Sequence, residues 1–438
     1  MLLTAPTLAP RPPAVEDAVL ARTPRERAEV ASFLLLAAGA AWTSRRGAGL
    51  DASWSVTVGM ASTLPLLVVC RAWRLPAAWL ALALALPLSV LLTALVVPEG
   101  TGAARAVAYG YGSVAFVAVA AFARTPARRL LATGALALVV LDQLAQSWLA
   151  WWGSQDPTRM LTGSFNWHNQ YGIFCGAGLV VCAGVAVLSM TGRVRAAAVA
   201  VGSVLLTGLL GSASRGSVLL VAVALGLLLV IALRAVGPAR AVVRLTGFVV
   251  AGLAVGLLLR SPLFFATWSM PWAPLVSRSV LDPAAPSGAF QPATGNASAR
   301  FSMWDAAWRL FLDRPLTGWG LETYGERSDR YMPPGITRSV DPHNELLRAA
   351  AEGGLIQVLP LLAVLLVAAA VGLVHLWRVL RVPARASADA GRVAALLACT
   401  VLIAHSLMDF DWSYPTLVMA AGWCLAVLVS PVREPAAG

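Results

Sequence analysis

The stretch Ser217-Val-Leu-Leu-Val-Ala-Val-Ala-Leu-Gly-Leu-Leu-Leu-Val-Ile-Ala-Leu-Arg234 decides the fold class. It carries no charge before its last residue, and as an α-helix it can cross a hydrocarbon core roughly 30 Å thick. Apolar runs of about 18–22 residues recur along the chain, which is 58% hydrophobic and only 12% charged. Only helices and closed barrels satisfy the backbone in lipid, and these runs are too long and continuous for barrel strands. The sequence therefore predicts an all-α polytopic membrane protein.

Working outward from this stretch, the apolar runs predict about twelve transmembrane helices. The predicted spans cover residues 29–44, 53–70, 76–97, 106–123, 130–150, 172–191, 196–213, 217–235, 241–259, 355–377, 393–411 and 415–432. The predicted organisation is a disordered cytoplasmic tail (1–28), transmembrane helices 1–9 (29–259), a large extracytoplasmic loop (260–343), and transmembrane helices 10–12 with a short cytoplasmic tail (344–438).

The charge pattern indicates topology rather than nucleic-acid binding. The net charge is +12, and every basic residue is an arginine. The arginines fall mostly between the apolar runs instead of forming one patch, so they do not describe a groove that follows phosphates. With the N-terminus inside, arginine-rich connections alternate with poorer ones, as cytoplasmic and outer loops do. This predicts that both termini are cytoplasmic and that the 260–343 loop is exported.

Inside the large loop, residues 300–313 have the periodicity of an amphipathic helix. Such a helix could lie in the membrane interface. Its predicted apolar face holds Phe301, Trp304, Trp308 and Phe311, and its polar face holds Asp305, Arg309 and Asp313, with opposite charges four residues apart.

A titratable side chain stands where this loop re-enters the membrane, in Asp341-Pro-His-Asn-Glu-Leu-Leu-Arg348. An imidazole accepts a proton near neutral pH. The packing of a membrane bundle does not require His343 at this place, so its position indicates an active site on the extracytoplasmic side. The alternative is a solvated or helix-capping histidine at the end of a loop.

Two arginines are candidates for binding a phosphate group. Arg215 interrupts an apolar sequence in Gly211-Ser-Ala-Ser-Arg-Gly-Ser217, where small neighbours leave room for an anion. A guanidinium grips phosphate through a bidentate fork, and charges at the ends of spans are functional candidates. The alternative for Arg215 is a loop arginine that reaches toward the membrane surface. Arg300, which opens the amphipathic helix, would by itself be an ordinary surface residue.

Further polar residues are candidates for lining the same aqueous cavity. Arg159, His168 and Asn169 lie together in another predicted outer loop, and Asn344 and Arg348 accompany His343. The alternative is that they are ordinary polar residues of loops.

Several other chemistries find no support in the sequence. No Gly-rich phosphate cradle precedes a helix, and no His, Cys or carboxylate set has the spacing of metal ligands, so neither a metal nor a cofactor is predicted. Asp409-Phe-Asp411 fits the Asp-x-Asp pattern of metal-dependent enzymes that use nucleotide sugars. The predicted topology places it outside, where cytosolic nucleotide sugars are absent, so we interpret these residues as span-end carboxylates.

Taken together, these residues resemble the O-antigen ligase and polymerase superfamily of bacterial membrane glycosyltransferases. The resemblance covers roughly residues 155–360 of the sequence. The overall number of predicted spans is similar as well. It rests on Thr162-Gly-Ser-Phe-Asn166…Asn169, Ser214-Arg-Gly216, Arg300…Trp304…Pro315-Leu-Thr-Gly318…Gly320, and His343-Asn344 followed by Gly354. The ligase-type signature ends in Gly-x-x-Gly, whereas Leu355, Ile356 and Gln357 follow Gly354 here, so ligase and polymerase both stay open.

The resemblance implies a metal-independent, inverting transfer of a glycan from undecaprenyl diphosphate to an acceptor hydroxyl. The acceptor is a lipid A core sugar for a ligase and another repeat unit for a polymerase. By motif match, His343 takes the role of the base, and Arg215 and Arg300 bind the diphosphate. The implied partners are the lipid-linked glycan donor, a glycan or glycolipid acceptor and the lipid bilayer, with no nucleic acid, and the implied location is the bacterial inner membrane.

Two other function classes remain as alternatives. A transporter or flippase of lipid-linked or small polar substrates would show matching broken helices in two halves of the chain, and no such pairing is evident. A different glycosyltransferase architecture would use a carboxylate in the first outer loop, here Asp51, and nothing around Asp51 adds support.

Overall fold

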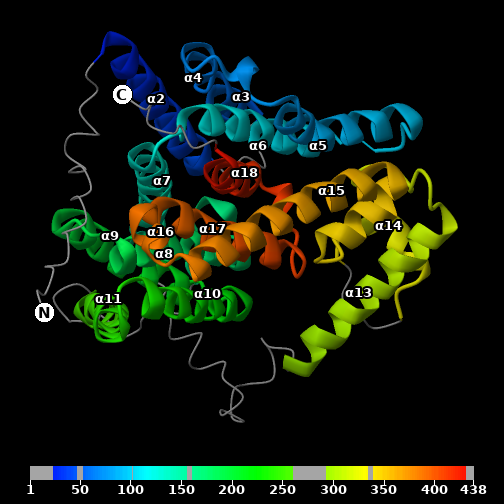
Figure 1. The fold of residues 1–438 in the computed structure, drawn as a ribbon. Coiled ribbons are helices and arrows are strands. Elements are labelled where there is room, and N and C mark those ends of the chain that lie inside the picture. Colours follow the sequence, from blue (N-terminus) through cyan, green and yellow to red (C-terminus); the bar gives the residue numbers. More distant parts are fainter. Residues whose placement is uncertain are drawn as a thin grey trace, which may run out of the picture.

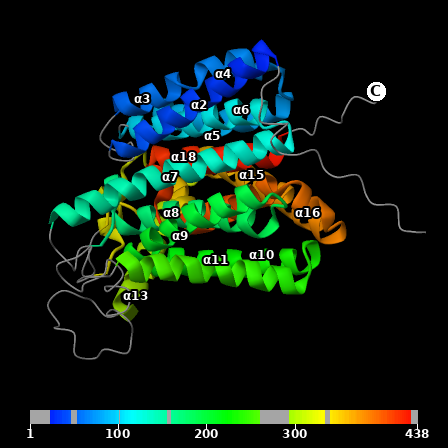
Figure 2. The same ribbon diagram turned by 90° about the vertical axis from the view of Figure 1, so that its left-hand side faces the viewer.

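The computed structural model describes residues 23–46, 53–100, 102–154, 160–259, 293–333 and 339–430. Within these residues the chain forms α-helices and short 3-10 helices and no strand, so the all-α prediction is confirmed. The helices pack into one bundle from which α13 projects at one side (Figures 1 and 2).

The helices follow the apolar runs of the sequence in order. The α-helices are α2 (Pro24–Arg45), α3 (Ser53–Ala61), α4 (Leu64–Val69), α5 (Ala77–Val96), α6 (Ala103–Phe122), α7 (Pro126–Ser154), α8 (His168–Leu188), α9 (Gly192–Gly211), α10 (Arg215–Ala235), α11 (Pro238–Leu259), α13 (Ala293–Asp313), α14 (Tyr324–Arg327), α15 (Glu345–Arg381), α16 (Ala384–Ala388), α17 (Ala390–Ser406) and α18 (Pro415–Val429). The 3-10 helices are η2 (Ala72–Arg74), η3 (Gly163–Phe165), η4 (Ser328–Arg330) and η5 (Asp411–Ser413).

The predicted number of about twelve spans is not confirmed. Of the helices in the described ranges, eight are long and apolar enough to cross a membrane: α5 to α11 and α15. The predicted span at 53–70 is divided into α3 and α4, and α17 and α18 are shorter than the eight. Much of the predicted large loop (260–292 and 334–338) and most of the predicted tail (1–22) lie outside the described residues, while α2 begins at Pro24, inside the predicted tail.

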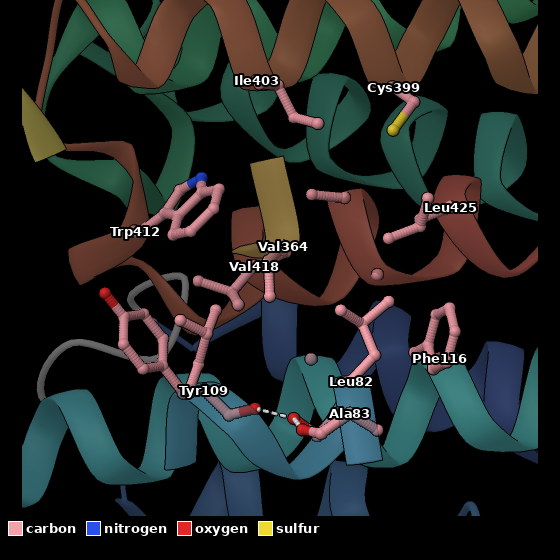
Figure 3. Close-up of a pocket in the computed structure, with 15 residues that line it drawn as sticks. Leu82, Ala83, Tyr109, Phe116, Val364, Cys399, Ile403, Trp412, Val418 and Leu425 are labelled. Carbon is pink, nitrogen blue, oxygen red and sulfur yellow. Dashed lines mark hydrogen bonds between the residues drawn. The ribbon is translucent and has the colours of Figure 1, made fainter. Parts of the chain in front are cut away.

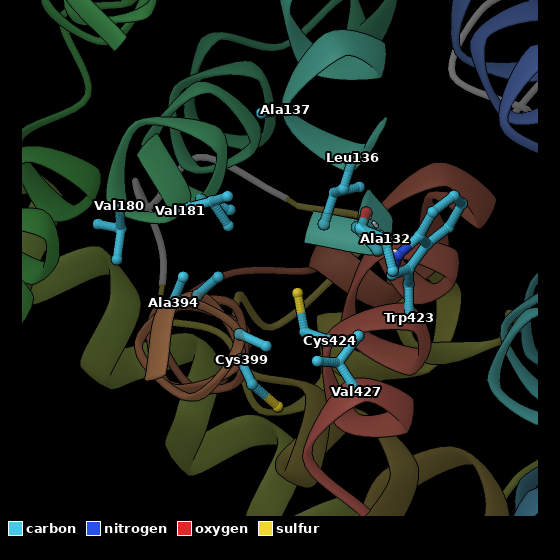
Figure 4. Close-up of a cluster of buried hydrophobic side chains, with 14 of the residues drawn as sticks. Ala132, Leu136, Ala137, Val180, Val181, Ala394, Cys399, Trp423, Cys424 and Val427 are labelled. Carbon is cyan, nitrogen blue, oxygen red and sulfur yellow. Dashed lines mark hydrogen bonds between the residues drawn. The ribbon is translucent and has the colours of Figure 1, made fainter. Parts of the chain in front are cut away.

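The bundle is built around α8, whose apolar window is entirely buried. It packs against α7, α9, α10 and α17. Small residues let these helices approach closely, as is typical in membranes: a Cβ added at Gly184 of α8 would lie 3.0 Å from the Cβ of Ala394 in α17. Figure 4 shows the core beside α8, where Val181 of α8 and Leu136 of α7 lie with Ala394 and Cys424.

Two contacts fix α18 inside the bundle. A Cβ added at Gly422 would lie 2.5 Å from the carbonyl oxygen of Gly112 in α6, so the two backbones touch there. The indole Nε1 of Trp423 donates to the carbonyl of Ala132 in α7 at 3.1 Å. Buried indoles usually need such a partner, and this one ties α18 to the other side of the core.

Helix α13 confirms the helix expected at 300–313 and its internal ion pair, Asp305 with Arg309 at 2.8 Å. Ala307 and Leu310 face the protein and pack with Ala351 of α15. Much of the predicted apolar face is exposed, with Phe301 at 65% and Trp308 at 48%. An exposed aromatic face of this kind fits a helix lying against a membrane interface.

Candidate active site

His343 lies directly before α15 in a strained backbone conformation. Its φ is +52°, which a non-glycine residue adopts only at a cost. The helix is capped instead by Asn344, whose Oδ1 accepts from the backbone N–H of Leu347 at 3.0 Å. The amide nitrogen of Asn344 donates to the carbonyl of Leu407 at 2.8 Å. Because Asn344 performs the capping, the imidazole of His343 is available for another contact.

That contact is with Asp409, in the turn after α17. Nδ1 of His343 lies 2.8 Å from Oδ1 of Asp409. The other carboxylate oxygen accepts from Nδ2 of Asn169 at 2.8 Å and from the guanidinium of Arg300 at 3.3 Å. Arg300 also donates to the carbonyl of Met408 at 2.8 Å. The structure thus brings three predicted site residues, His343, Asn169 and Arg300, onto one carboxylate.

The surroundings of Asp409 keep it ionised. Its side chain is 2% exposed, and burial by itself disfavours the charge. The hydrogen bond and charge of His343, together with the charges of His405 and Arg300, outweigh burial and hold the pKa of Asp409 well below its usual range. An ionised carboxylate can only accept hydrogen bonds, so Nδ1 of His343 carries the proton. Nε2 of His343 is therefore the nitrogen that can accept one.

A second His–Asp pair lies next to the first. Nδ1 of His405 is 2.7 Å from Oδ2 of Asp411, and Gln170 donates to the other oxygen of that carboxylate at 3.3 Å. Nε2 of His405 lies 3.4 Å from the hydroxyl of Ser217. Both members of the pair are buried, at 3% and 1% exposed. This pair holds the two ends of the turn that carries Asp409.

Arg215 is the first residue of α10 and is exposed. Ser214 caps this helix by accepting from the backbone N–H of Ser217 at 3.4 Å, and the hydroxyl of Ser217 donates to the carbonyl of Asn169 at 3.3 Å. These bonds place the start of α10 beside the start of α8. Nδ1 of His168 lies 3.0 Å from the carbonyl oxygen of Ser212, in the turn between α9 and α10.

Arg348 belongs to a buried ion-pair network rather than to an open surface. Its guanidinium pairs with Glu345 at 2.6 Å and with Asp341 at 2.9 Å, and its side chain is 3% exposed. Glu345 also accepts from the backbone N–H of Trp412 at 2.7 Å. The network fastens the segment before His343 to the segment after Asp409. Arg159, the remaining predicted cavity residue, lies outside the described residues.

Two glycines, Gly318 and Gly354, allow the segment after α13 to pack closely against α15. Gly354 has φ +55° within α15, and Gly318 has φ +65°. A Cβ at Gly318 would lie 2.3 Å from the carbonyl carbon of Glu352, which no side chain could accept. The backbone N–H of Leu355 donates to the carbonyl of Pro315 at 2.8 Å. Segment 315–320 therefore packs against the kink of α15. This close backbone approach accounts for the glycines at positions 318 and 354.

Sequence reasoning missed the roles of three residues: Asp409, Asp411 and His405. The first two follow α17 and bind the two histidines. The signal was present, because ionisable residues at the end of an apolar run are functional candidates. Over the described ranges, no group of three or more His, Cys, Asp or Glu side chains is arranged to hold a metal ion.

The site gathers the N-terminal ends of α8, α10 and α15 around the turn that follows α17. Fold and site together define a multi-pass helical membrane protein with a buried, arginine-bound His–Asp pair. Residues 198–362 match the family model described as O-antigen ligase, and the predicted resemblance to the O-antigen ligase and polymerase superfamily is confirmed. This match supports an O-antigen ligase- or polymerase-like membrane glycosyltransferase, and together with the apolar helices it indicates a protein of the bacterial inner membrane.

The matched segment holds Arg215, Arg300 and His343, whereas Asn169 and Asp409 lie outside it. No curated protein matches the chain.

Proposed function

We propose that this protein transfers a glycan from undecaprenyl diphosphate to an acceptor hydroxyl on the extracytoplasmic side of the membrane, with inversion and without a metal. The observation that carries the proposal is the 2.8 Å contact between Nδ1 of His343 and Asp409. A carboxylate that fixes the tautomer and orientation of an imidazole is the arrangement expected of a general base.

In the proposed step, the acceptor oxygen attacks the anomeric carbon of the glycan while the bond from that carbon to the diphosphate oxygen breaks. The acceptor proton passes to Nε2 of His343, and the electron pair of the broken bond leaves with undecaprenyl diphosphate. A single displacement of this kind inverts the anomeric centre. A positioned base contributes about 10²–10⁴-fold to such a transfer.

Arg215 and Arg300 are the proposed ligands of the diphosphate. Negative charge grows on the leaving group as the bond breaks, and fixed guanidinium groups can stabilise it. Two nitrogens of Arg300 donate hydrogen bonds, one to Asp409 and one to the carbonyl of Met408. Because a guanidinium has five N–H donors, other donors of Arg300 can bind phosphate. The N-termini of three helices, α8, α10 and α15, also face the site and favour an anion there.

The experiment that tests this function uses a deletion strain and an analysis of its lipid-linked glycans. Loss of a ligase leaves long chains on undecaprenyl diphosphate, and loss of a polymerase leaves single repeats. Unchanged lipid-linked glycans would contradict the proposal. The purified protein in lipid nanodiscs, given a lipid-linked glycan and an acceptor, should also release undecaprenyl diphosphate.

A further inference from the structure

An apolar pocket lies between α5, α6, α15, α17 and α18, with Trp412 of η5 in its lining (Figure 3). About 590 Å³ of space free of protein atoms lies in and at the mouth of this pocket, open solvent included. No charged side chain lines it. The lining residues are Leu82, Ala83, Leu86, Tyr109, Gly112, Ser113, Phe116, Val364, Cys399, Ile403, Trp412, Val418, Ala421, Gly422 and Leu425.

A proline in α5 accounts for part of the pocket wall. Pro87 lacks an N–H, so the carbonyl of Ala83, four residues earlier, loses its helical partner. The hydroxyl of Ser113 in α6 donates to this carbonyl instead. Ala83 and Ser113 both line the pocket. The one polar group exposed by the proline is thus satisfied within the protein, and the wall stays apolar.

One end of the pocket is close to the catalytic turn. Tyr109 and Trp412 lie at that end, with ring centroids 6.1 Å apart, and Phe116 and Leu425 lie toward the other (Figure 3). Trp412 is three residues beyond Asp409, and the ring of the intervening Phe410 lies 5.1 Å from that of His343. The end of the pocket with Tyr109 and Trp412 is therefore the one nearer to His343 and Asp409.

We propose that this pocket holds the isoprene units of the donor nearest the diphosphate, an inference that rests on the proposed function. The lining carries no charge for a phosphate, and most of it is apolar apart from the hydroxyls of Tyr109 and Ser113 and the indole of Trp412, so the proposed occupant is an apolar chain. From Tyr109 to Phe116 the wall is seven residues of α6, or about 10 Å, which suits a few units of a long chain. The chain starts at a headgroup held by the proposed site, and the end of the pocket with Tyr109 and Trp412 is the one nearer to that site.

The remaining chain can reach the bilayer between α5 and α15. Only 22% of the apolar window of each of these two helices is buried, so both stand at the outside of the bundle. Lipid tails are as apolar as this lining, so the pocket gains little from burial and selects by shape. Its effect is to fix the direction in which the chain leaves the diphosphate, and with it the position of the anomeric carbon.

The first test fills the pocket. Val364→Trp and Ala421→Phe place a ring in the space, and Val223→Trp on the 62% exposed face of α10 is the matched control. In nanodiscs, the filled variants should raise the KM for the lipid-linked donor on the order of tenfold, with the acceptor KM unchanged. The control should keep both values. A rise in the acceptor KM instead would assign the pocket to an acyl chain of the acceptor, and no change in either would overturn the proposal.

The second test needs no turnover. A polyprenyl diphosphate with a photoreactive group on its second isoprene should label peptides of α6 or α18 that contain pocket residues. Undecaprenyl diphosphate should compete with this labelling, whereas a phospholipid with saturated acyl chains should not. Labelling in a protein that transfers no glycan would retain the pocket and reject the proposed function. Labelling elsewhere, or competition by the phospholipid, would reject the pocket.

Discussion

Asp409 accepts the Nδ1 proton of His343 across 2.8 Å, although the two residues are 66 positions apart in the chain. His343 comes from the segment before α15 and Asp409 from the turn after α17. The pair is held by Asn344, which donates to Leu407, and by Glu345, which accepts from Trp412. Neighbours in the chain therefore fix both His343 and Asp409.

The pair predicts different losses for its two members. His343→Ala removes proton acceptance and should lower kcat about 10²–10⁴-fold, with donor affinity nearly unchanged. Asp409→Asn keeps the shape but no longer fixes the tautomer, so kcat should fall about 10–100-fold. The measurement is the transfer rate of each purified variant with a normal size-exclusion profile. A well-folded His343→Ala protein with wild-type transfer would reject the mechanism.

Replacement of the arginines should affect donor binding as well as turnover. Arg215→Ala should weaken donor affinity roughly 10–100-fold, because it removes hydrogen bonds to a charged group, which contribute about 1.5–3 kcal/mol. Arg215→Lys should restore little, because an ammonium keeps the charge and loses the bidentate fork. Arg300→Ala should resemble Arg215→Ala, with a further loss of kcat because Arg300 also binds Asp409. Donor affinity can be measured by binding of undecaprenyl diphosphate. Unaltered affinity in Arg215→Ala would remove that residue from the diphosphate site.

The pH dependence of stability should report the lowered pKa of Asp409. The lowered pKa of Asp409 keeps it ionised above its ordinary value of about 3.9, so it does not titrate where the enzyme is assayed. The paired charge of Asp409 therefore stabilises the fold above about pH 3.9, and this contribution is lost as the pH falls below that value. The difference in Tm between the wild type and Asp409→Asn should therefore shrink on acidification below about pH 4. A difference in Tm that stays constant over this range would contradict the lowered pKa of Asp409.

Chelation should leave the reaction intact. The two carboxylates of the Asp-x-Asp pattern are each bound to a histidine, Asp409 to His343 and Asp411 to His405. Transfer should therefore continue at an unchanged rate in EDTA. If activity were lost and then restored by Mg²⁺ or Mn²⁺, the role of the arginines as the charge-stabilising groups would be wrong.

Topology can be tested by cysteine labelling in intact cells. The five native cysteines are buried and give a low background. A cysteine at exposed Glu326 should react with an impermeant reagent from outside. A cysteine at exposed Arg193, at the start of α9, should react only after permeabilisation. The reverse pattern would overturn the orientation and, with it, an extracytoplasmic active site.

The length and continuity of its apolar runs by themselves determined that this chain is a helical membrane protein. A run such as 217–235 has no other stable form in lipid, because an unpaired backbone there is too costly. The loop motif and the candidates His343, Arg215 and Arg300 were also visible, since charged groups stand out against such a background. Periodicity likewise predicted helix α13 and its Asp305–Arg309 pair.

Only the tertiary structure decided the partners of those residues. From the sequence, Asp409 was interpreted as a carboxylate at the end of a span. Its contact with His343 depends on how α15 and α17 pack, which no local sequence pattern encodes. The kink at Gly354, the burial of Arg348 and the pocket beneath Trp412 are likewise products of packing. The hydrophobic runs are local in sequence and determine where the helices form. The distances between polar groups depend instead on how helices far apart in sequence pack against one another.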